Sequence, residues 1–119
     1  GDYFLCKKEA ISPVNIQYEL QEGLLRVSLT GELGHHEAIR LMAQLNGLVE
    51  DHLPARMELD FSGLEFMDSS GIAVVVQTAR KCQSCGGKLS VTHTPAQAQK
   101  VLTCAGIHRL VDICQEGAE

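Results

Sequence analysis

Residues 59–77 read LDFSGLEFMDSSGIAVVVQ and contain the clearest strand-to-helix transition of the chain. Alternating apolar side chains over residues 57–61 predict a buried strand. A loop over residues 62–68 is expected to follow and to present the DSSG segment, residues 68–71, at the start of a helix. That helix has apolar residues at the spacing of one helix face, which predicts burial of Ile72, Val75, Val76, Ala79 and Cys82.

Strands and helices alternate on both sides of this stretch. Two alternating runs joined by Gln21-Glu22-Gly23 predict a β-hairpin near the N-terminus, and Pro54 is expected to end the first amphipathic helix. The remaining elements are predicted at residues 14–20, 25–29, 35–52, 88–92, 95–106 and 110–113. The order β-β-α-β-α-β-α-β predicts a single α/β domain with a mixed, mostly parallel sheet whose opening hairpin forms an antiparallel edge.

Single residues help to place the last helix, the last strand and the N-terminal segment. Thr94, Pro95 and Gln97 predict a capped start for the last helix, with Thr94 as the cap and Gln97 completing a capping box. The last strand is predicted from Leu110, Val111 and Ile113. Residues 1–13 show no period, so we interpret them as an extension or a weak first strand that precedes a domain over residues 14–119.

Composition and charge exclude several classes of function. The chain has 119 residues, is 45% hydrophobic and carries a net charge of −5. It has no cluster of Lys and Arg, so no nucleic-acid partner is expected, and an acidic domain gains no attraction to an anionic membrane surface. No apolar run approaches the roughly 20 residues of a membrane helix and no signal peptide is legible. These features predict a cytoplasmic domain that binds a protein or a small molecule.

The serines of the DSSG segment have three possible roles. Backbone N–H groups at a helix start are unpaired and favour a negative charge, so a serine there can carry a phosphate. Asp and Ser are also the usual N-cap residues, and on these residues alone a cap is favoured over a switch. Some hydrolases present a serine on a strand-to-helix turn, but the glycine pattern around Ser69 and Ser70 does not fit that elbow.

The same segment resembles the signature of the STAS domain, the family of sulfate transporters and anti-sigma factor antagonists. The resemblance is greatest to bacterial anti-sigma factor antagonists of the sporulation sigma-F type, and it covers residues 14–113. Its motifs are Leu29-Thr30-Gly31-Glu32-Leu33 with His35-His36, Leu59-Asp60-Phe61, Phe66-Met67-Asp68-Ser69-Ser70-Gly71, Gly86-Gly87, Thr94-Pro95-Ala96 and Ala105-Gly106-Ile107.

This resemblance implies a cycle of partner switching. The unphosphorylated domain binds an anti-sigma factor that is also a serine kinase, and a sigma factor is released for transcription. The kinase then phosphorylates the domain with its own ATP, the domain dissociates, and a serine phosphatase resets it. The implied phosphoacceptor is Ser69, and the implied partner-binding residues are Glu32, Gly34, His35, Asp68, Ser69, Ser70 and Gly71. Gly34 stands where relatives usually carry Asp, which leaves its partner contact or phosphorylation efficiency open.

Other readings of single motifs are weaker. Cys82 and Cys85 form a C-x-x-C that could be a redox pair or half a zinc site, but no second C-x-x-C exists and five cysteines without a secretory signal indicate free thiols. His35 and His36 diverge by about 100° on a helix, so they do not suit one metal ion. We interpret Glu32 as a partner contact, since a general base would need a nucleophile and a pocket beside it. We therefore expect no metal and no cofactor.

Three hypotheses for function follow from these residues and the resemblance. The first is the phosphorylated anti-sigma factor antagonist. The second is a non-switching STAS scaffold, for example an accessory subunit of a lipid transporter, but the intact acceptor at Ser69 favours the first. The third is an enzyme or a nucleotide-binding domain; it ranks last because no phosphate-binding glycine loop and no nucleophile–base pair is legible.

Overall fold

The computed structural model of the chain describes residues 14–115. The order β-β-α-β-α-β-α-β is confirmed, and the predicted extension over residues 1–13 lies outside the described part. A short 3-10 helix before the last strand was not predicted. The elements are β1 (Val14–Gln21), β2 (Leu24–Leu33), α2 (His35–His52), β3 (Arg56–Met67), α3 (Ser70–Ser84), β4 (Lys88–Thr94), α4 (Ala96–Cys104), η1 (Ile107–Arg109) and β5 (Asp112–Gln115).

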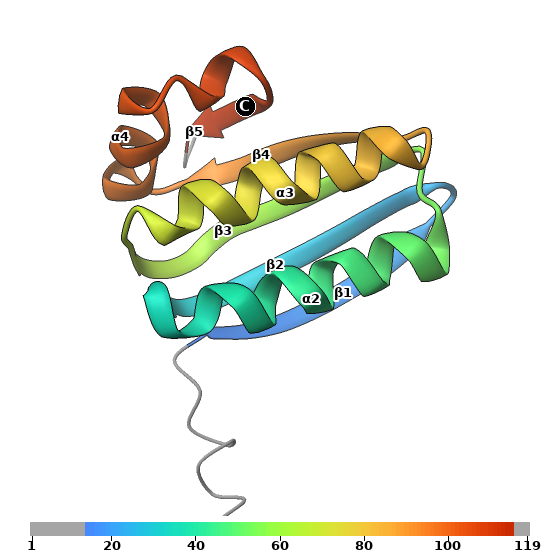
Figure 1. Cartoon of the computed structure of the whole chain (residues 1–119), viewed down its shortest axis with the longest axis horizontal. Helices are drawn as coiled ribbons and strands as arrows, with labels where there is room; N and C mark the ends of the chain where they lie inside the picture. The colour runs from blue at the N-terminus through green and yellow to red at the C-terminus, as the bar shows by residue number, and fades with distance from the viewer. Residues whose placement is uncertain (1–13, 116–119) are drawn as a thin grey trace, which may run out of the picture.

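The five strands form one mixed sheet in the order β1-β2-β3-β4-β5 (Figure 1). The hairpin partner β1 runs antiparallel to β2, and the three remaining pairs are parallel. The hairpin turn uses two residues with positive φ, Glu22 at 51° and Gly23 at 83°, which is the geometry of a tight two-residue turn. The predicted mostly parallel sheet with an antiparallel edge is therefore confirmed.

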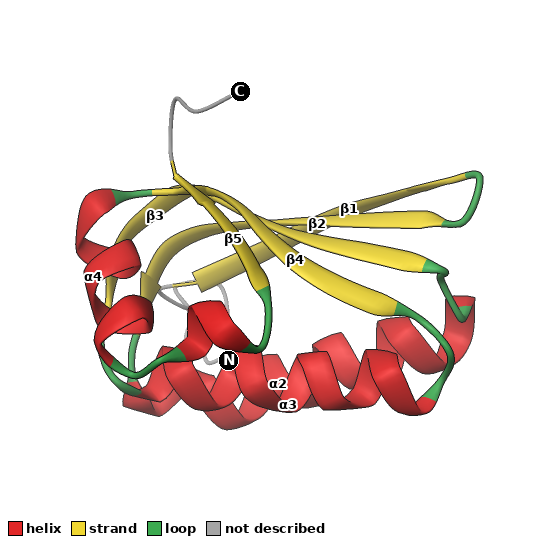
Figure 2. Cartoon of the chain, turned by 90° about the horizontal axis from the view of Figure 1, so that it is seen from above, coloured by secondary structure: helices red, strands yellow, loops and turns green. Residues whose placement is uncertain are grey.

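Helices α2 and α3 lie along one face of the sheet, while α4 lies at one end of it (Figure 2). The core fills the space between this helical layer and the sheet, and Phe61 is the only aromatic side chain in it among the described residues. An ion pair between Glu50 of α2 and Lys81 of α3 joins the two helices at the surface. The other face of the sheet carries polar pairs such as Arg26 and Glu58, where Arg26 Nε donates to Glu58 Oε1 at 3.0 Å.

Strand β3 continues through the region predicted to be a loop, so the prediction for residues 62–68 is wrong up to Met67. The strand stays paired with β2 because two register shifts absorb the irregular residues, giving the pairs Thr30–Gly63 and Leu33–Met67. Gly63 allows β3 to lie close to β2 at this point, because a Cβ on residue 63 would lie only 2.5 Å from Thr30 Cγ2. The strand therefore carries the chain directly to Asp68 at the edge where the helices begin.

The predicted burial in α3 is confirmed at Val75 and Cys82, and the predicted Ile72, Val76 and Ala79 are partly buried against the core. Val74 and Thr78, which were not predicted, are also buried. Thr78 is polar, so the spacing of apolar residues does not predict its burial. Its hydroxyl donates to the Val74 carbonyl at 2.7 Å, and this hydrogen bond allows it to lie in the core.

The predicted capping box of α4 is wrong. Thr94 belongs to β4, where it pairs with Gln115, and its hydroxyl makes no hydrogen bond to a helix N–H. Pro95 occupies the N-cap position and provides no side-chain cap. The Gln97 side chain instead reaches back to β3.

The last strand begins later than predicted. Leu110 and Val111 precede β5, which starts at Asp112. They follow the 3-10 turn η1, and both of their N–H groups donate to the Ile107 carbonyl, at 2.9 and 3.1 Å. Because their backbone donors close this turn, they are not available to a sheet ladder.

Candidate functional site

Ser69 lies between the end of β3 and the first residue of α3, at the edge of the sheet where α2 also begins (Figure 1). Its backbone is already helical, with φ −64° and ψ −15°, and its side chain makes no cap hydrogen bond. Ser69 is exposed. The Ser69 side chain therefore does not cap α3, and its hydroxyl is accessible to a partner.

Asp68 fixes the position of Ser69. Its N–H donates to the Leu33 carbonyl at 3.1 Å. Its carboxylate accepts two hydrogen bonds, Oδ1 from the Ser70 N–H at 2.8 Å and Oδ2 from the His35 N–H at 3.2 Å. The residue thereby holds the starts of α2 and α3 together on either side of the serine.

The first N–H groups of α3 have partners in the structure. Besides Ser70, the Gly71 N–H donates to the Asp68 carbonyl at 3.0 Å and the Ile72 N–H to the Ser69 carbonyl at 3.1 Å. The expectation that a phosphate would find unpaired N–H groups here therefore needs revision. A phosphate on Ser69 would meet the Asp68 carboxylate at the same helix start.

The remaining predicted site residues lie at the same edge in two groups. Gly34 and His35 are in direct reach of Asp68: a Cβ on Gly34 would lie 3.5 Å from Asp68 Oδ2. Glu32 is exposed near the end of β2 and pairs with Phe66 in the sheet register. Ser70 and Gly71 open α3, and the half-buried and buried positions they occupy make them supports of Ser69. No hydrogen bond or ion pair among the described contacts joins Glu32 to Ser69.

Gln97 is a site residue that the sequence did not identify. Its side-chain amide makes two hydrogen bonds to the backbone of Met67, accepting from the N–H at 2.9 Å and donating to the carbonyl at 2.8 Å. The amide thus extends the end of β3 like a further strand and ties α4 to the residue before Asp68. The sequence pattern assigned Gln97 to a capping box with Thr94, so this contact with β3 was not predicted.

A shallow groove of about 500 Å³ lies beside the start of α3. Ile72 forms part of it, and this residue is one helical turn from Ser69, so the two lie on the same side of α3. The other lining residues come from α4 and its end: Gln97, Lys100, Val101, Cys104 and Ala105.

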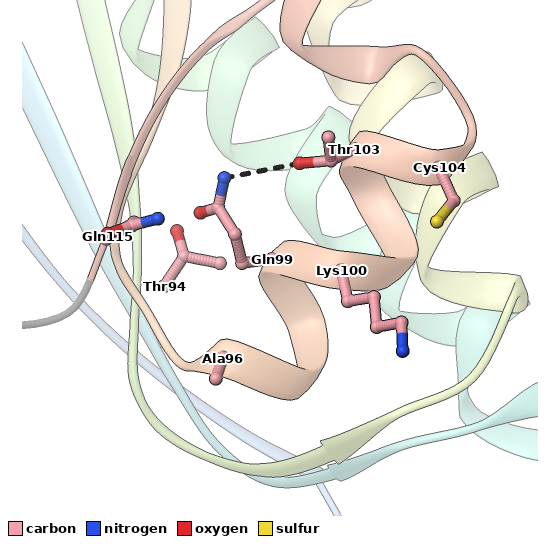
Figure 3. Close-up of a pocket in the computed structure, with 7 residues that line it drawn as sticks. All are labelled: Thr94, Ala96, Gln99, Lys100, Thr103, Cys104 and Gln115. Atoms are coloured by element: carbon pink, nitrogen blue, oxygen red, sulfur yellow. Dashed lines mark hydrogen bonds between the residues drawn. The ribbon is translucent and has the colours of Figure 1, made fainter.

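A second hollow of about 560 Å³ lies between α4 and the end of β5 (Figure 3). It is lined by polar side chains such as Gln99, whose Nε2 donates to Thr103 Oγ1 at 3.2 Å. None of the predicted site residues lines it, and it offers no nucleophile paired with a base. We therefore place the candidate site at Ser69.

The cysteines of the described part of the chain are free thiols. There are four of them, and nowhere in residues 14–115 do three His, Cys, Asp or Glu side chains gather to hold a metal ion. Cys82 is buried, with its Sγ 3.5 Å from Met57 Sδ. Burial, followed by the charge of Cys85, raises the pKa of Cys82 to about 11.

This pKa predicts slow alkylation of Cys82 in the folded protein. Because its pKa is raised above the ordinary value of 9.0, the thiolate at pH 8 is about 100-fold scarcer than in an unfolded chain, and iodoacetamide should modify Cys82 at least that much more slowly. The raised pKa stabilises the fold below pH 9, and this contribution is lost as the pH rises through about 11. Exposed Cys104 is the control; equal labelling rates at Cys82 and Cys104 would contradict the prediction.

Comparison with known proteins gives the family. The family model described as "Mlab, STAS domain" matches residues 16–112. The chain belongs to the STAS domain family. Within residues 14–115, this STAS domain has no helix that is long and apolar enough to cross a membrane.

Named relatives of this STAS domain are anti-sigma factor antagonists. The chain is 28% identical over 102 residues to the anti-sigma F factor antagonist of Paenibacillus polymyxa, which covers 84% of this chain and 87% of the relative. Solved structures of SpoIIAA share the fold. The unphosphorylated anti-sigma factor antagonist aligns with a TM-score of 0.72 at 23% identity, covering 86% of this chain and 90% of that chain. The phosphorylated Bacillus form aligns with 0.65 at 23% identity, covering 86% and 93%.

Proposed function

We propose that this STAS domain is an anti-sigma factor antagonist that phosphorylation of Ser69 switches off. The observation that carries the proposal is the exposed, uncapped hydroxyl of Ser69 at the start of α3, in a chain whose named relative is an anti-sigma F factor antagonist. In the unmodified state, the surface at the starts of α2 and α3 binds an anti-sigma factor that is a serine kinase. That binding releases the sigma factor.

The switching step is a phosphoryl transfer from ATP held by the kinase. Ser69 Oγ attacks the γ-phosphorus, so a P–Oγ bond forms while the bond from phosphorus to ADP breaks, and the hydroxyl proton passes to a base of the kinase. The protein supplies position only: Asp68 and Gln97 hold the residues before Ser69 through their hydrogen bonds to His35, Ser70 and Met67. A serine phosphatase then transfers the phosphoryl group to water and restores the hydroxyl.

Adjacent serines give a matched test of the acceptor. We expect Ser70→Ala to accept one phosphate at Ser69 at a rate within about threefold of the parent chain, because Ser70 binds Asp68 through its backbone N–H, which alanine keeps. Ser69→Ala should accept none. The assay mixes each variant with the kinase anti-sigma factor and ATP and maps the phosphate by mass spectrometry.

The same assay separates the proposal from its alternative. A phosphate on Ser70, or on Ser84 at the other end of α3, would contradict the assignment of Ser69. Binding of the kinase without any phosphate transfer would favour a non-switching STAS scaffold.

A further inference from the structure

Asp68 is the residue that could carry a signal from Ser69 to α2. Its hydrogen bonds to the Leu33 carbonyl and the His35 N–H lie on either side of Gly34. Its other carboxylate oxygen accepts from the Ser70 N–H. One carboxylate therefore binds the first N–H group of two helices, and the His35 contact spans 33 positions of sequence.

The start of α2 depends on this remote carboxylate. Gly34 occupies the N-cap position with extended backbone, φ −120° and ψ −175°, and provides no side-chain cap. The first N–H groups of a helix have no partner within the helix, and a side-chain oxygen normally satisfies one of them. Here Asp68 takes that role at His35, beside a turn bond from the Glu37 N–H to the Gly34 carbonyl at 3.1 Å.

Phosphate on Ser69 would compete with this arrangement. The phosphate adds about −1.5 to −2 charges next to the Asp68 carboxylate, and the N–H groups of Ser70, Gly71 and Ile72 already have acceptors. The phosphate gains a donor at the start of α3 by taking the Ser70 N–H from Asp68, and like-charge repulsion acts on Asp68 in the same direction.

We propose that phosphate on Ser69 displaces the Asp68 carboxylate from the starts of both helices, so that modification releases the first turn of α2 as well as charging α3. This rests on the proposed function for the identity of the modification, but the contact itself is a property of the chain alone. Asp68 is then a positioning residue that extends the effect of the switch to Gly34 and His35.

The test uses full-length protein with phosphoserine placed at position 69 by genetic-code expansion, so no kinase is needed. We expect the His35 amide proton to shift upfield in NMR spectra, and its hydrogen exchange to become at least about tenfold faster. The Ser70 amide, which passes from Asp68 to the phosphate, should stay protected. Amides in the buried part of α2, such as that of Leu45, should not change. Unchanged shifts and exchange at His35 would overturn the proposal.

A matched control carries the same charge at the opposite end of α3. Ser84 is exposed and is the last residue of that 15-residue helix, about 22 Å from its start. Phosphoserine at position 84 should leave the His35 amide unchanged. An equal effect from both positions would show a general response to charge and would overturn the role of Asp68.

A second variant tests the cap directly. Gly34→Ser supplies a local, uncharged cap, and its Cβ fits at an ordinary contact distance of 3.5 Å from Asp68 Oδ2. In this variant, phosphate on Ser69 should accelerate exchange of the amides of residues 35–37 less than in the parent chain. Equal acceleration in both chains would overturn the proposal.

Measuring kinase affinity on the same samples separates this inference from the proposed function. Weaker kinase binding with an unchanged His35 amide would overturn the role of Asp68 alone. A released His35 amide with unchanged kinase binding would support the role of Asp68 and overturn the proposed function.

Discussion

Phosphate on Ser69 is expected to weaken binding to the anti-sigma factor kinase by at least about 100-fold, or about 2.7 kcal/mol, with little change in melting temperature. A partner that covers the exposed Ser69 must desolvate a dianion that lies beside the Asp68 carboxylate, and a buried unpaired charge at an interface costs roughly 2–5 kcal/mol. The fold should survive because Ser69 is at the surface and outside the core.

Calorimetry with the unmodified and the phosphorylated protein measures this effect, and Ser69→Asp should reproduce it in part. Ser69→Ala is the matched control, since it removes the acceptor without adding charge and should bind within about tenfold of the parent. Affinity that stays the same after complete modification of Ser69 would contradict the proposed switch. A fall in melting temperature by more than about 10 °C, which exceeds the loss of a single helix cap, would indicate a folding defect in its place.

Gly71→Ala is expected to destabilise the domain by roughly 1–3 kcal/mol, the usual cost of overpacking a core. A Cβ at this position would lie 2.3 Å from Met67 Cγ and 2.4 Å from its Sδ, and the Met67 side chain is fully buried. The glycine of the DSSG segment is therefore required for packing: it lets the end of β3 lie against the first turn of α3, and so it sets the position of Ser69.

Gly47→Ala is the matched control for this variant. Gly47 also lies inside a helix, but nothing lies within 4 Å of a Cβ built there. Alanine should stabilise α2 by roughly 0.5–1 kcal/mol. Urea unfolding of both variants gives the comparison: a loss of stability at Gly71 and a gain at Gly47 are expected, and equal effects would refute the packing role of Gly71.

Much of the fold follows from local sequence patterns. The apolar period over residues 35–52 gives the bounds of α2 correctly, because a two-layer fold buries a single stripe of that helix. The continuation of β3 past Phe61 does not follow, since Ser62 and Gly63 are typical of a loop. Pairing with β2 keeps them in the sheet. Pairing between distant segments cannot be predicted from the local order of apolar and polar residues.

Local sequence likewise predicts one part of the candidate site and not the other. The position of Ser69 at the start of a helix follows from the strand, loop and helix signals around it. The contacts of Asp68 with His35 and of Gln97 with Met67 join residues that are 30 or more positions apart. They depend on how the crossovers bring the starts of α2, α3 and α4 to one edge of the sheet, so neither could be predicted from spacing.

Release of the sigma factor is the reaction that Ser69 is proposed to control. The measurement starts from a preformed complex of the sigma factor with its serine-kinase anti-sigma factor and follows free sigma factor as this protein is added without ATP. We predict that the unmodified chain displaces the sigma factor and that the chain carrying phosphoserine at position 69 does not, even at about a 100-fold higher concentration. Equal displacement by both forms, or displacement by neither, would contradict it.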